Sequence, residues 1–338
     1  MKLRIAVIGC GSVSQQFHLP AIASSAAFEL VGLADNDPRN LKRTASVWNA
    51  TQVVHDYRQL RDLDAVIVAT PHSLHAPMCE YFLTQGVHVL VEKPLALTSV
   101  EARKLVELAQ QNRRVLAVGV FRRFYPVSAF VKSALQCGSM SGLGRLLSVD
   151  AEEGAIYDWA LQSRYLLNRS LAGGGVLIDT GSHLLDRLLW WLPEFEPHVI
   201  SFVDDADGGV EADCELWGEF QRSEQSIKLR VCLSRIRQLR NTIRLQFEGG
   251  WLEIGANSAH RFVLQIDDWN GGQPIECLYA AEKSPLAYFV VQLENFAEAI
   301  EKGTDPIHSA NSNLRTVEFI EACYQQRSHV EQAWERWP

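Results

Sequence analysis

Short apolar runs alternate with helix-like stretches along roughly the first 120 residues of the chain. The runs that predict strands are Leu3–Ile8, Leu30–Ala34, Ala65–Ala69, Val87–Val91 and Val115–Val118. The clearest helix follows Thr98, where Thr98 and Glu101 fit a capping box ahead of apolar residues at helical spacing. Strands that alternate with helices indicate βαβ units, so we expect a parallel sheet with helices on both faces.

The pattern changes near Arg122. The predicted elements beyond it are helices at Pro126–Leu135, about 175–192, about 285–302 and about 312–328, and strands that include Arg145–Glu152, Ser226–Ser234, Thr242–Phe247 and Trp251–Ile254. Strands that follow one another without helices predict an antiparallel sheet. We therefore expect an α/β domain over residues 1–122 and an α+β domain with a large, mostly antiparallel sheet over residues 123–338.

Composition limits the possible functions. The net charge of −8 argues against a nucleic-acid-binding protein, because such proteins present a basic face. Arg235, Arg237 and Arg240 alternate with apolar residues, which predicts the solvent side of a strand.

Seven scattered cysteines without a C-x-x-C pair indicate a reducing compartment with buried or free thiols, and neither a disulfide framework nor a metal site. The apolar run after the first residues is too short for a signal peptide, and nowhere do about 18 apolar residues run together. We expect a cytoplasmic protein without a membrane span.

Gly9-Cys10-Gly11-Ser12-Val13-Ser14 follows the first predicted strand and opens a helix. A dinucleotide-binding turn has this context, since small residues let a pyrophosphate approach the backbone and the helix N-terminus. Ser14 replaces the third glycine of that fingerprint and is small enough for close helix–strand packing. A simple tight turn fits the same residues, but the position after the first strand favours cofactor binding.

Asp35 ends the second predicted strand, close to the spacing expected for a carboxylate on the adenosine ribose. Such a carboxylate accepts from the 2′-hydroxyl and repels a 2′-phosphate, so we expect NAD rather than NADP. Arg39, Lys42 and Arg43 lie just downstream and could weaken that preference. The alternative is that Asp35 caps the helix that begins near Pro38.

Glu92-Lys93-Pro94 closes an apolar strand. Ligands of open α/β sheets bind beyond the carboxyl ends of the strands, so a lysine there is placed for chemistry rather than for packing. Pro94 fixes the backbone, and a cis bond before it would aim Lys93 toward the ligand.

Thr70 and Pro71 end another strand, and His72 and His75 follow them. These residues fall at the same edge of the sheet, where they can contact a cofactor. Histidines in such places are more often helix caps or surface residues than catalysts.

Asp179 and His183 are four positions apart in a predicted helix, so helical spacing stacks them on one face together with Asp186. A histidine is a suitable base for a substrate hydroxyl near neutral pH. The alternative is an Asp/His pair that stabilises a helix surface. Gly181 disfavours this alternative, because a glycine inside a helix suggests close approach of a ligand or another backbone.

Together these motifs resemble the Gfo/Idh/MocA oxidoreductase family, which includes glucose–fructose oxidoreductase and inositol dehydrogenase. The resemblance covers most of the chain and rests on Gly9–Ser14, Thr70-Pro71 with His75, Glu92-Lys93-Pro94, Arg122-Arg123-Phe124 with Pro126, and Gly174-Gly175 through Asp179, His183 and Asp186. It implies an N-terminal Rossmann domain and hydride transfer between NAD, or alternatively NADP, and a hydroxyl or ketone of a sugar, polyol or nucleotide sugar. It also implies a homodimer or homotetramer that forms through the open face of the C-terminal sheet.

The resemblance implies catalytic roles for Lys93, Asp179 and His183, with His183 as the base and Lys93 as a hydrogen-bond donor to the substrate oxygen. With the patterns above, the expected cofactor contacts are Gly9, Gly11, Ser12, Val13, Asp35, Thr70, Pro71, His75, Glu92, Lys93 and Arg122. The expected substrate contacts are the three catalytic residues and Tyr157, Trp159 and Arg164, although core packing explains Trp159 equally well. Phe121 departs from the asparagine that often precedes the arginine pair, which affects the contacts on the nicotinamide side.

Two other functions share these motifs. One is an NAD-dependent glycosidase of the same superfamily, and the other is a non-catalytic regulator that senses the cofactor. Retention of Lys93, Asp179 and His183 together argues against the regulator.

Overall fold

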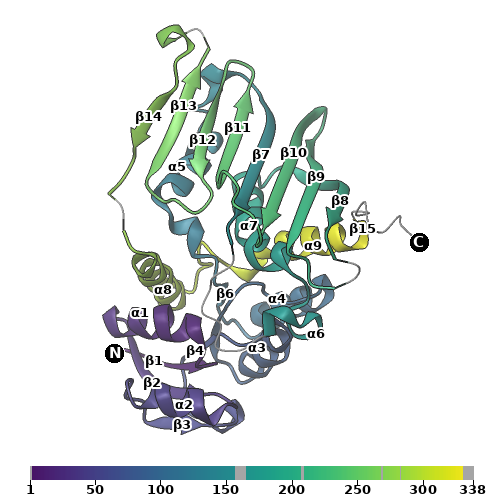
Figure 1. Cartoon of the computed structure of the whole chain (residues 1–338). Coiled ribbons are helices and arrows are strands. Elements are labelled where there is room, and N and C mark those ends of the chain that lie inside the picture. Colours follow the sequence, from purple (N-terminus) through teal and green to yellow (C-terminus); the bar gives the residue numbers. More distant parts are fainter. Residues whose placement is uncertain (1, 157–164, 207–208, 268, 282, 330–338) are drawn as a thin grey trace, which may run out of the picture. The chain divides into compact units, whose positions relative to one another are not determined.

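The structure, a computed structural model, describes residues 2–156, 165–206, 209–267, 269–281 and 283–329. Tyr157, Trp159 and Arg164, the expected substrate-side residues, lie outside these ranges. The chain forms two compact units (Figure 1). The first consists of Met1–Phe124, Trp159–Gly173 and Lys283–Val317, and the second of Tyr125–Asp158, Gly174–Glu282 and Glu318–Pro338. The first unit therefore combines an N-terminal stretch with segments from later in the chain.

The first unit is built on a six-stranded sheet with the order β3-β2-β1-β4-β5-β6, in which all neighbours are parallel. Its strands are β1 (Leu3–Ile8), β2 (Phe28–Ala34), β3 (Gln52–Val54), β4 (Ala65–Val68), β5 (His88–Val91) and β6 (Leu116–Val118). The predicted parallel α/β sheet is confirmed. Only β3 has no matching apolar run, because it is a three-residue strand at the sheet edge without a fully buried residue.

Helices cover both faces of this sheet, as predicted. Ile5 and Val7 of β1 join a core with α1 and α8, whereas Ala6 and Ile8 join a separate core with α3 and α4. The helices of the first unit are α1 (Leu19–Ser24), α2 (Pro38–Ala45), α3 (His75–Thr84), α4 (Ser99–Gln111), the short α6 (Arg169–Ala172) and α8 (Pro285–Lys302). The predicted capping box of α4 is present. Alternation of side chains along each strand therefore divides the interior into two layers.

The second unit contains a nine-stranded sheet with the order β14-β13-β12-β11-β7-β10-β9-β8-β15. Its strands are β7 (Leu146–Gly154), β8 (Glu196–Asp204), β9 (Asp213–Arg222), β10 (Gln225–Ser234), β11 (Thr242–Phe247), β12 (Gly250–Gly255), β13 (Arg261–Ile266), β14 (Ile275–Leu278) and β15 (Arg327–His329). The pairs β7–β10 and β8–β15 are parallel and the others antiparallel, so the predicted, mostly antiparallel sheet is confirmed.

Two helices of the second unit, α5 (Pro126–Gln136) and α7 (Ser182–Trp191), pack together. The indole N–H of Trp191 donates to the carbonyl of Ser128 over 3.0 Å. The last helix, α9 (Ala310–Gln325), ends earlier than the predicted 312–328, because the backbone of β15 pairs with β8 instead of continuing the helix. Among the described helices, none is both long and apolar enough to cross a membrane.

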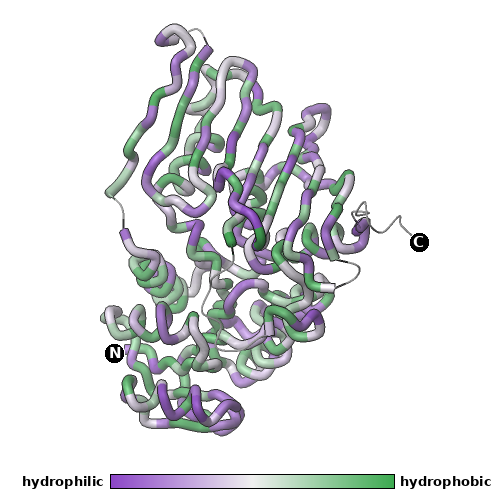
Figure 2. Tube along the Cα trace, in the orientation of Figure 1, coloured by the Kyte–Doolittle hydropathy of each residue, from purple (hydrophilic) through white to green (hydrophobic). Residues whose placement is uncertain are grey.

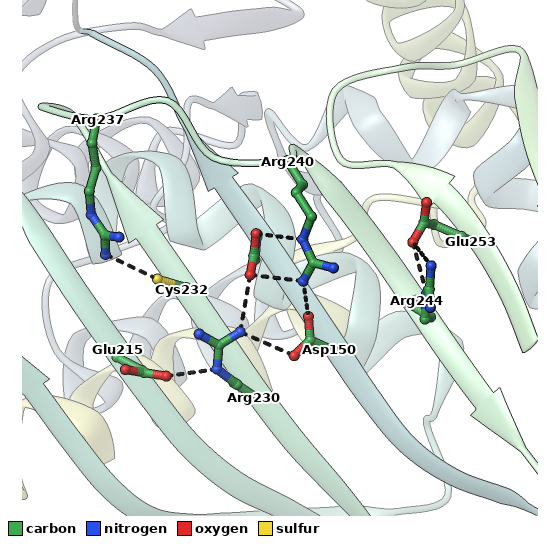
Figure 3. A network of polar contacts seen from close by, with 9 residues as sticks. Asp150, Glu215, Arg230, Cys232, Arg237, Arg240, Arg244 and Glu253 are labelled. Atoms are coloured by element: carbon green, nitrogen blue, oxygen red, sulfur yellow. Dashed lines mark hydrogen bonds and ion pairs between the residues drawn. The ribbon is translucent and has the colours of Figure 1, made fainter.

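Polar and apolar positions alternate along the central strands of the nine-stranded sheet (Figure 2). Figure 3 shows the charged network that results: Arg230 of β10 contacts Asp150 of β7 at 3.2 Å and Glu215 of β9 at 2.7 Å. Arg240 donates to Glu152 over 2.9 Å, and this hydrogen bond is the main cause that lowers the pKa of Glu152 to about 2. One face of this sheet is therefore polar and charge-paired.

All seven cysteines are free thiols, and most are buried.

Candidate functional site

The turn after β1 contains two glycines, and packing requires only one of them. Gly9 has φ of +93°, and a Cβ there would overlap the carbonyl oxygen of Ala69. The fold itself therefore requires Gly9. Gly11 has no positive φ, and a Cβ there would meet nothing within 4 Å. The protein's own packing does not require Gly11, and it leaves space against the backbone for a ligand.

A helix begins at Ser12 and Val13, directly after this turn, and its Ser14–His18 section is π-helical. The Ser14 hydroxyl donates back to the Gly9 carbonyl over 2.5 Å, which ties the helix to the turn. Unpaired N–H groups and the helix dipole at such an N-terminus favour an anion. The arrangement fits the pyrophosphate of a dinucleotide.

Asp35 lies beside the same turn. Its Oδ2 accepts from the Cys10 N–H over 2.7 Å, and its Oδ1 accepts from the Asp37 N–H over 2.8 Å. The residue that caps α2 is Asp37, whose side chain accepts from the Arg39 N–H. The alternative reading of Asp35 as the cap of this helix is therefore wrong. Arg39 pairs with Asp37 at 3.4 Å.

The turn that carries Lys93 follows β5 and is fixed by a buried histidine–carboxylate hydrogen bond. The His18 ring donates from Nε2 to Glu92 Oε1 over 2.7 Å, and Glu92 Oε2 accepts from the Lys93 N–H over 3.2 Å. Burial alone raises the pKa of Glu92, but the hydrogen bond and charge of His18 bring it below its usual value. A Cβ at Gly119 would lie 2.9 Å from this carboxyl, so Gly119 makes room for it. The peptide bond between Lys93 and Pro94 is cis, the form considered from the sequence, and Lys93 is partly exposed.

His75 links this turn to the end of β4. Its ring nitrogens lie 2.7 Å from the Pro94 carbonyl oxygen and 2.9 Å from that of Thr70. A neutral imidazole can donate to only one of them. Burial is the main cause that lowers the pKa of His75, so the neutral ring is favoured. His75 and Glu92 thus hold backbone, and their contact with a cofactor stays a prediction.

The other expected contacts lie at the end of β4 or after β6. Thr70 and Pro71 are partly exposed, and His72 is buried with its Nδ1 2.8 Å from the carbonyl oxygen of Ala172. Arg122 lies in the short 3₁₀ helix Phe121–Phe124.

The second predicted catalytic segment belongs to the second unit, and its helix is less regular than predicted. Leu177–Gly181 is π-helical, and only then does α7 begin at Ser182. The α-helical stacking predicted for Asp179 and His183 therefore does not describe this turn. Nevertheless, the partly exposed positions between Gly174 and Leu189 are Asp179, Thr180 and His183. Asp186, predicted to share their face, is buried.

Gly181 is explained by packing. A Cβ at this position would lie 2.7 Å from the Leu233 side chain of β10. The sequence predicts a ligand or another backbone at this position, and the neighbour is instead a side chain of the sheet.

Asp179 has a partner that the sequence does not reveal. Arg235 Nη2 lies 3.0 Å from Asp179 Oδ2. Only 7% of the Arg235 side chain is exposed, so the prediction that it lies on the solvent side of a strand is wrong. It follows β10 in a loop, as do the more exposed Arg237 and Arg240. The prediction failed because arginines that alternate with apolar residues occur in a loop such as this one as well as in a strand.

Residues 3–120 match the family model of the Gfo/Idh/MocA proteins, described as an oxidoreductase family with an NAD-binding Rossmann fold. The rhizopine catabolism protein MocA of Rhizobium meliloti is 28% identical over 56% of this chain and 57% of its own length. Inositol 2-dehydrogenase of Rhizobium meliloti is 22% identical over 95% of this chain and 96% of its own.

A solved structure, the aldose-aldose oxidoreductase of Caulobacter crescentus complexed with glycerol, superposes with a TM-score of 0.81. It is 25% identical and covers 96% of this chain and 97% of its own. The match to the first curated relatives spans only about half of their length, from 47% to 57%.

The Glu92–His18 pair predicts a pH-dependent loss of stability. Glu92→Gln should lower the free energy of unfolding at pH 7 by about 2 kcal/mol, because a charge-assisted hydrogen bond is lost. The folded-state pKa of Glu92 is lowered, so this contribution is complete above the unfolded value near 4.5 and disappears as the pH falls through the folded value. Urea unfolding at pH 7 and pH 3 measures it. An equal difference between the two proteins at both pH values contradicts the assignment.

Proposed function

Taking residues 3–120 as the NAD-binding Rossmann domain of a Gfo/Idh/MocA oxidoreductase, we propose that the chain is an NAD-dependent dehydrogenase of a sugar- or polyol-like hydroxyl. One observation carries the proposal. Lys93, on a turn fixed by the Glu92–His18 pair, and the open backbone at Gly11 lie at the carboxyl ends of β5 and β1 in one parallel sheet. Ligands of such sheets bind at this edge.

The residues of the first unit fit a dinucleotide. Gly11 and the helix N-terminus at Ser12 and Val13 would hold the pyrophosphate, and Asp35 would accept from the adenosine ribose. When bound, the nicotinamide takes up or supplies the hydride.

We assign the interactions with the substrate hydroxyl group to three side chains. His183 would take the proton of the hydroxyl group, and the Lys93 ammonium would donate a hydrogen bond to the same oxygen and stabilise its developing negative charge. Asp179 would hold the substrate or polarise His183. Partial exposure of all three side chains supports these roles. The two groups of residues belong to different units, so their joint action rests on the family resemblance and on the geometry of each part.

Replacement of Lys93 tests the function. Lys93→Met should lower kcat by about 100-fold or more, because a preorganised donor to the oxyanion is lost. A cofactor-reduction screen over polyols, hexoses and nucleotide sugars supplies the assay. Fluorescence titration with NADH should show that binding is largely retained, because the other expected cofactor contacts remain. Lys104→Met is the matched control, since Lys104 is exposed and pairs with Glu80. Near-normal turnover of the Lys93 variant refutes the assignment.

Gly11 separates cofactor binding from folding. Gly11→Ala should weaken NADH binding by about tenfold or more, because the methyl group fills the space proposed for the pyrophosphate. The midpoint temperature of thermal unfolding should be unchanged or slightly higher, since alanine tolerates a backbone φ that is not positive. Gly142→Ala, which also meets no neighbour within 4 Å, is the control. A variant with unchanged NADH affinity would place the dinucleotide elsewhere.

The choice between NAD and NADP is proposed to depend on Asp35. Two backbone N–H groups hold its carboxylate in place, and the nearby Arg39 is paired with Asp37. Asp35→Ser should raise the NADP-to-NAD ratio of kcat/KM by about tenfold or more, because repulsion of a 2′-phosphate is removed. Glu80→Gln removes an exposed carboxylate of α3 that pairs with Lys104, and it should leave the ratio unchanged. Equal ratios in wild type and Asp35→Ser contradict this role.

A further inference from the structure

Arg235 is a guanidinium in a place where a charge is costly. It follows the last residue of β10, and only 7% of its side chain is exposed. A buried cation needs partners that offset its lost hydration. Its Nη2 provides two such contacts, 3.0 Å to Asp179 Oδ2 and 3.2 Å to the Gly175 carbonyl oxygen. One nitrogen thus joins the side chain of Asp179 to the first turn of its own helix.

The start of this helix is held by another buried residue, Glu211, which is fully buried. Glu211 Oε1 accepts from the N–H groups of Gly175 over 2.9 Å and Leu177 over 3.1 Å. The backbone carbonyl of Glu211 accepts from the Val176 N–H over 2.9 Å. Three successive N–H groups that a helix start leaves without intrahelical acceptors are therefore satisfied by one residue.

The same segment also fixes Arg235. The residue after Glu211, Ala212, accepts from the Arg235 N–H over 2.7 Å. A Cβ on Gly175 would overlap the Glu211 backbone, which explains the glycine there. Because Glu211-Ala212 anchors both Arg235 and the helix start, the distance between the guanidinium and Asp179 is set by a common support.

Asp179 lies in the π-helical turn, so its orientation depends on this support. Within Leu177–Gly181 the regular α-helical direction of side chains is lost, so helix geometry does not by itself aim the Asp179 carboxylate. We propose that Arg235 is a positioning residue that fixes the Asp179 carboxylate for the reaction, from a frame anchored by Glu211. This inference rests on the proposed dehydrogenase function, in which Asp179 acts on the substrate or on His183.

Kinetics of Arg235 variants test the inference. Arg235→Met should lower kcat by about 100-fold with unchanged KM for NAD and unchanged NADH affinity, because misplacement of a catalytic group affects turnover and not the remote cofactor site. Arg235→Lys keeps the charge but lacks the planar fork, so it should recover part of the loss. Arg237→Met is the matched control, because Arg237 is two positions away and pairs on the surface with Asp213.

A double-mutant cycle with Asp179→Asn shows whether Arg235 acts through Asp179. The double variant should be no slower than the slower single variant, since both changes remove one function. Multiplicative losses, or an Arg235→Met enzyme with wild-type kcat, overturn the inference while the Lys93 result still supports the dehydrogenase.

If the wild-type protein oxidises no compound of the panel, the proposed function fails. Urea unfolding of the wild type, the two single variants and the double variant then tests the Arg235–Asp179 pair. Additive changes in the unfolding midpoint would then show that the Arg235–Asp179 pair does not form and would overturn the inference on its own. Coupled changes would establish the pair independently of the substrate.

Discussion

A buried carboxylate must be paired or hydrogen-bonded, and this constraint fixes the backbone on which each predicted catalytic segment depends. In the first unit the Glu92 carboxylate accepts hydrogen bonds from the His18 ring and from the Lys93 N–H. In the second, Glu211 holds the start of the helix that carries Asp179 and His183. Taking a carboxylate out of water costs several kcal/mol unless such partners are present, so these turns have few alternative conformations. Rigid support of this kind is what a reacting side chain on a turn requires.

The glycines of the sequence motifs differ in whether packing requires them. Gly9 and Gly175 are required by neighbouring backbone, and Gly181 lies close to the end of the Leu233 side chain. Gly11 has no such neighbour, so the contacts of the chain itself do not explain its missing side chain. A glycine-rich motif therefore contains positions that packing requires and positions that it does not, and only contacts in space distinguish them.

A π-helical turn is associated with each segment: Ser14–His18 ends in the His18 that pairs with Glu92, and Leu177–Gly181 carries Asp179. Such turns widen the helix locally and occur frequently at functional sites. In the second unit the widened turn coincides with the partly exposed Asp179 and Thr180, in a helix that is otherwise largely buried. Departure from regular geometry thus marks the positions where packing does not determine the direction of the side chain.

The sequence by itself determined the class of each sheet, most strands of the first unit, the capping box at Thr98 and the resemblance to Gfo/Idh/MocA oxidoreductases, which the match over residues 3–120 confirms. These features follow from local periodicity, capping and short motifs, which depend on residues that are close together in the sequence. Tertiary structure alone decided that Arg235 is buried beside Asp179, that His18 pairs with Glu92, and that Glu211 supports the helix start. These partners are separated by tens of residues along the chain, and no local pattern encodes which distant side chain offsets a buried charge.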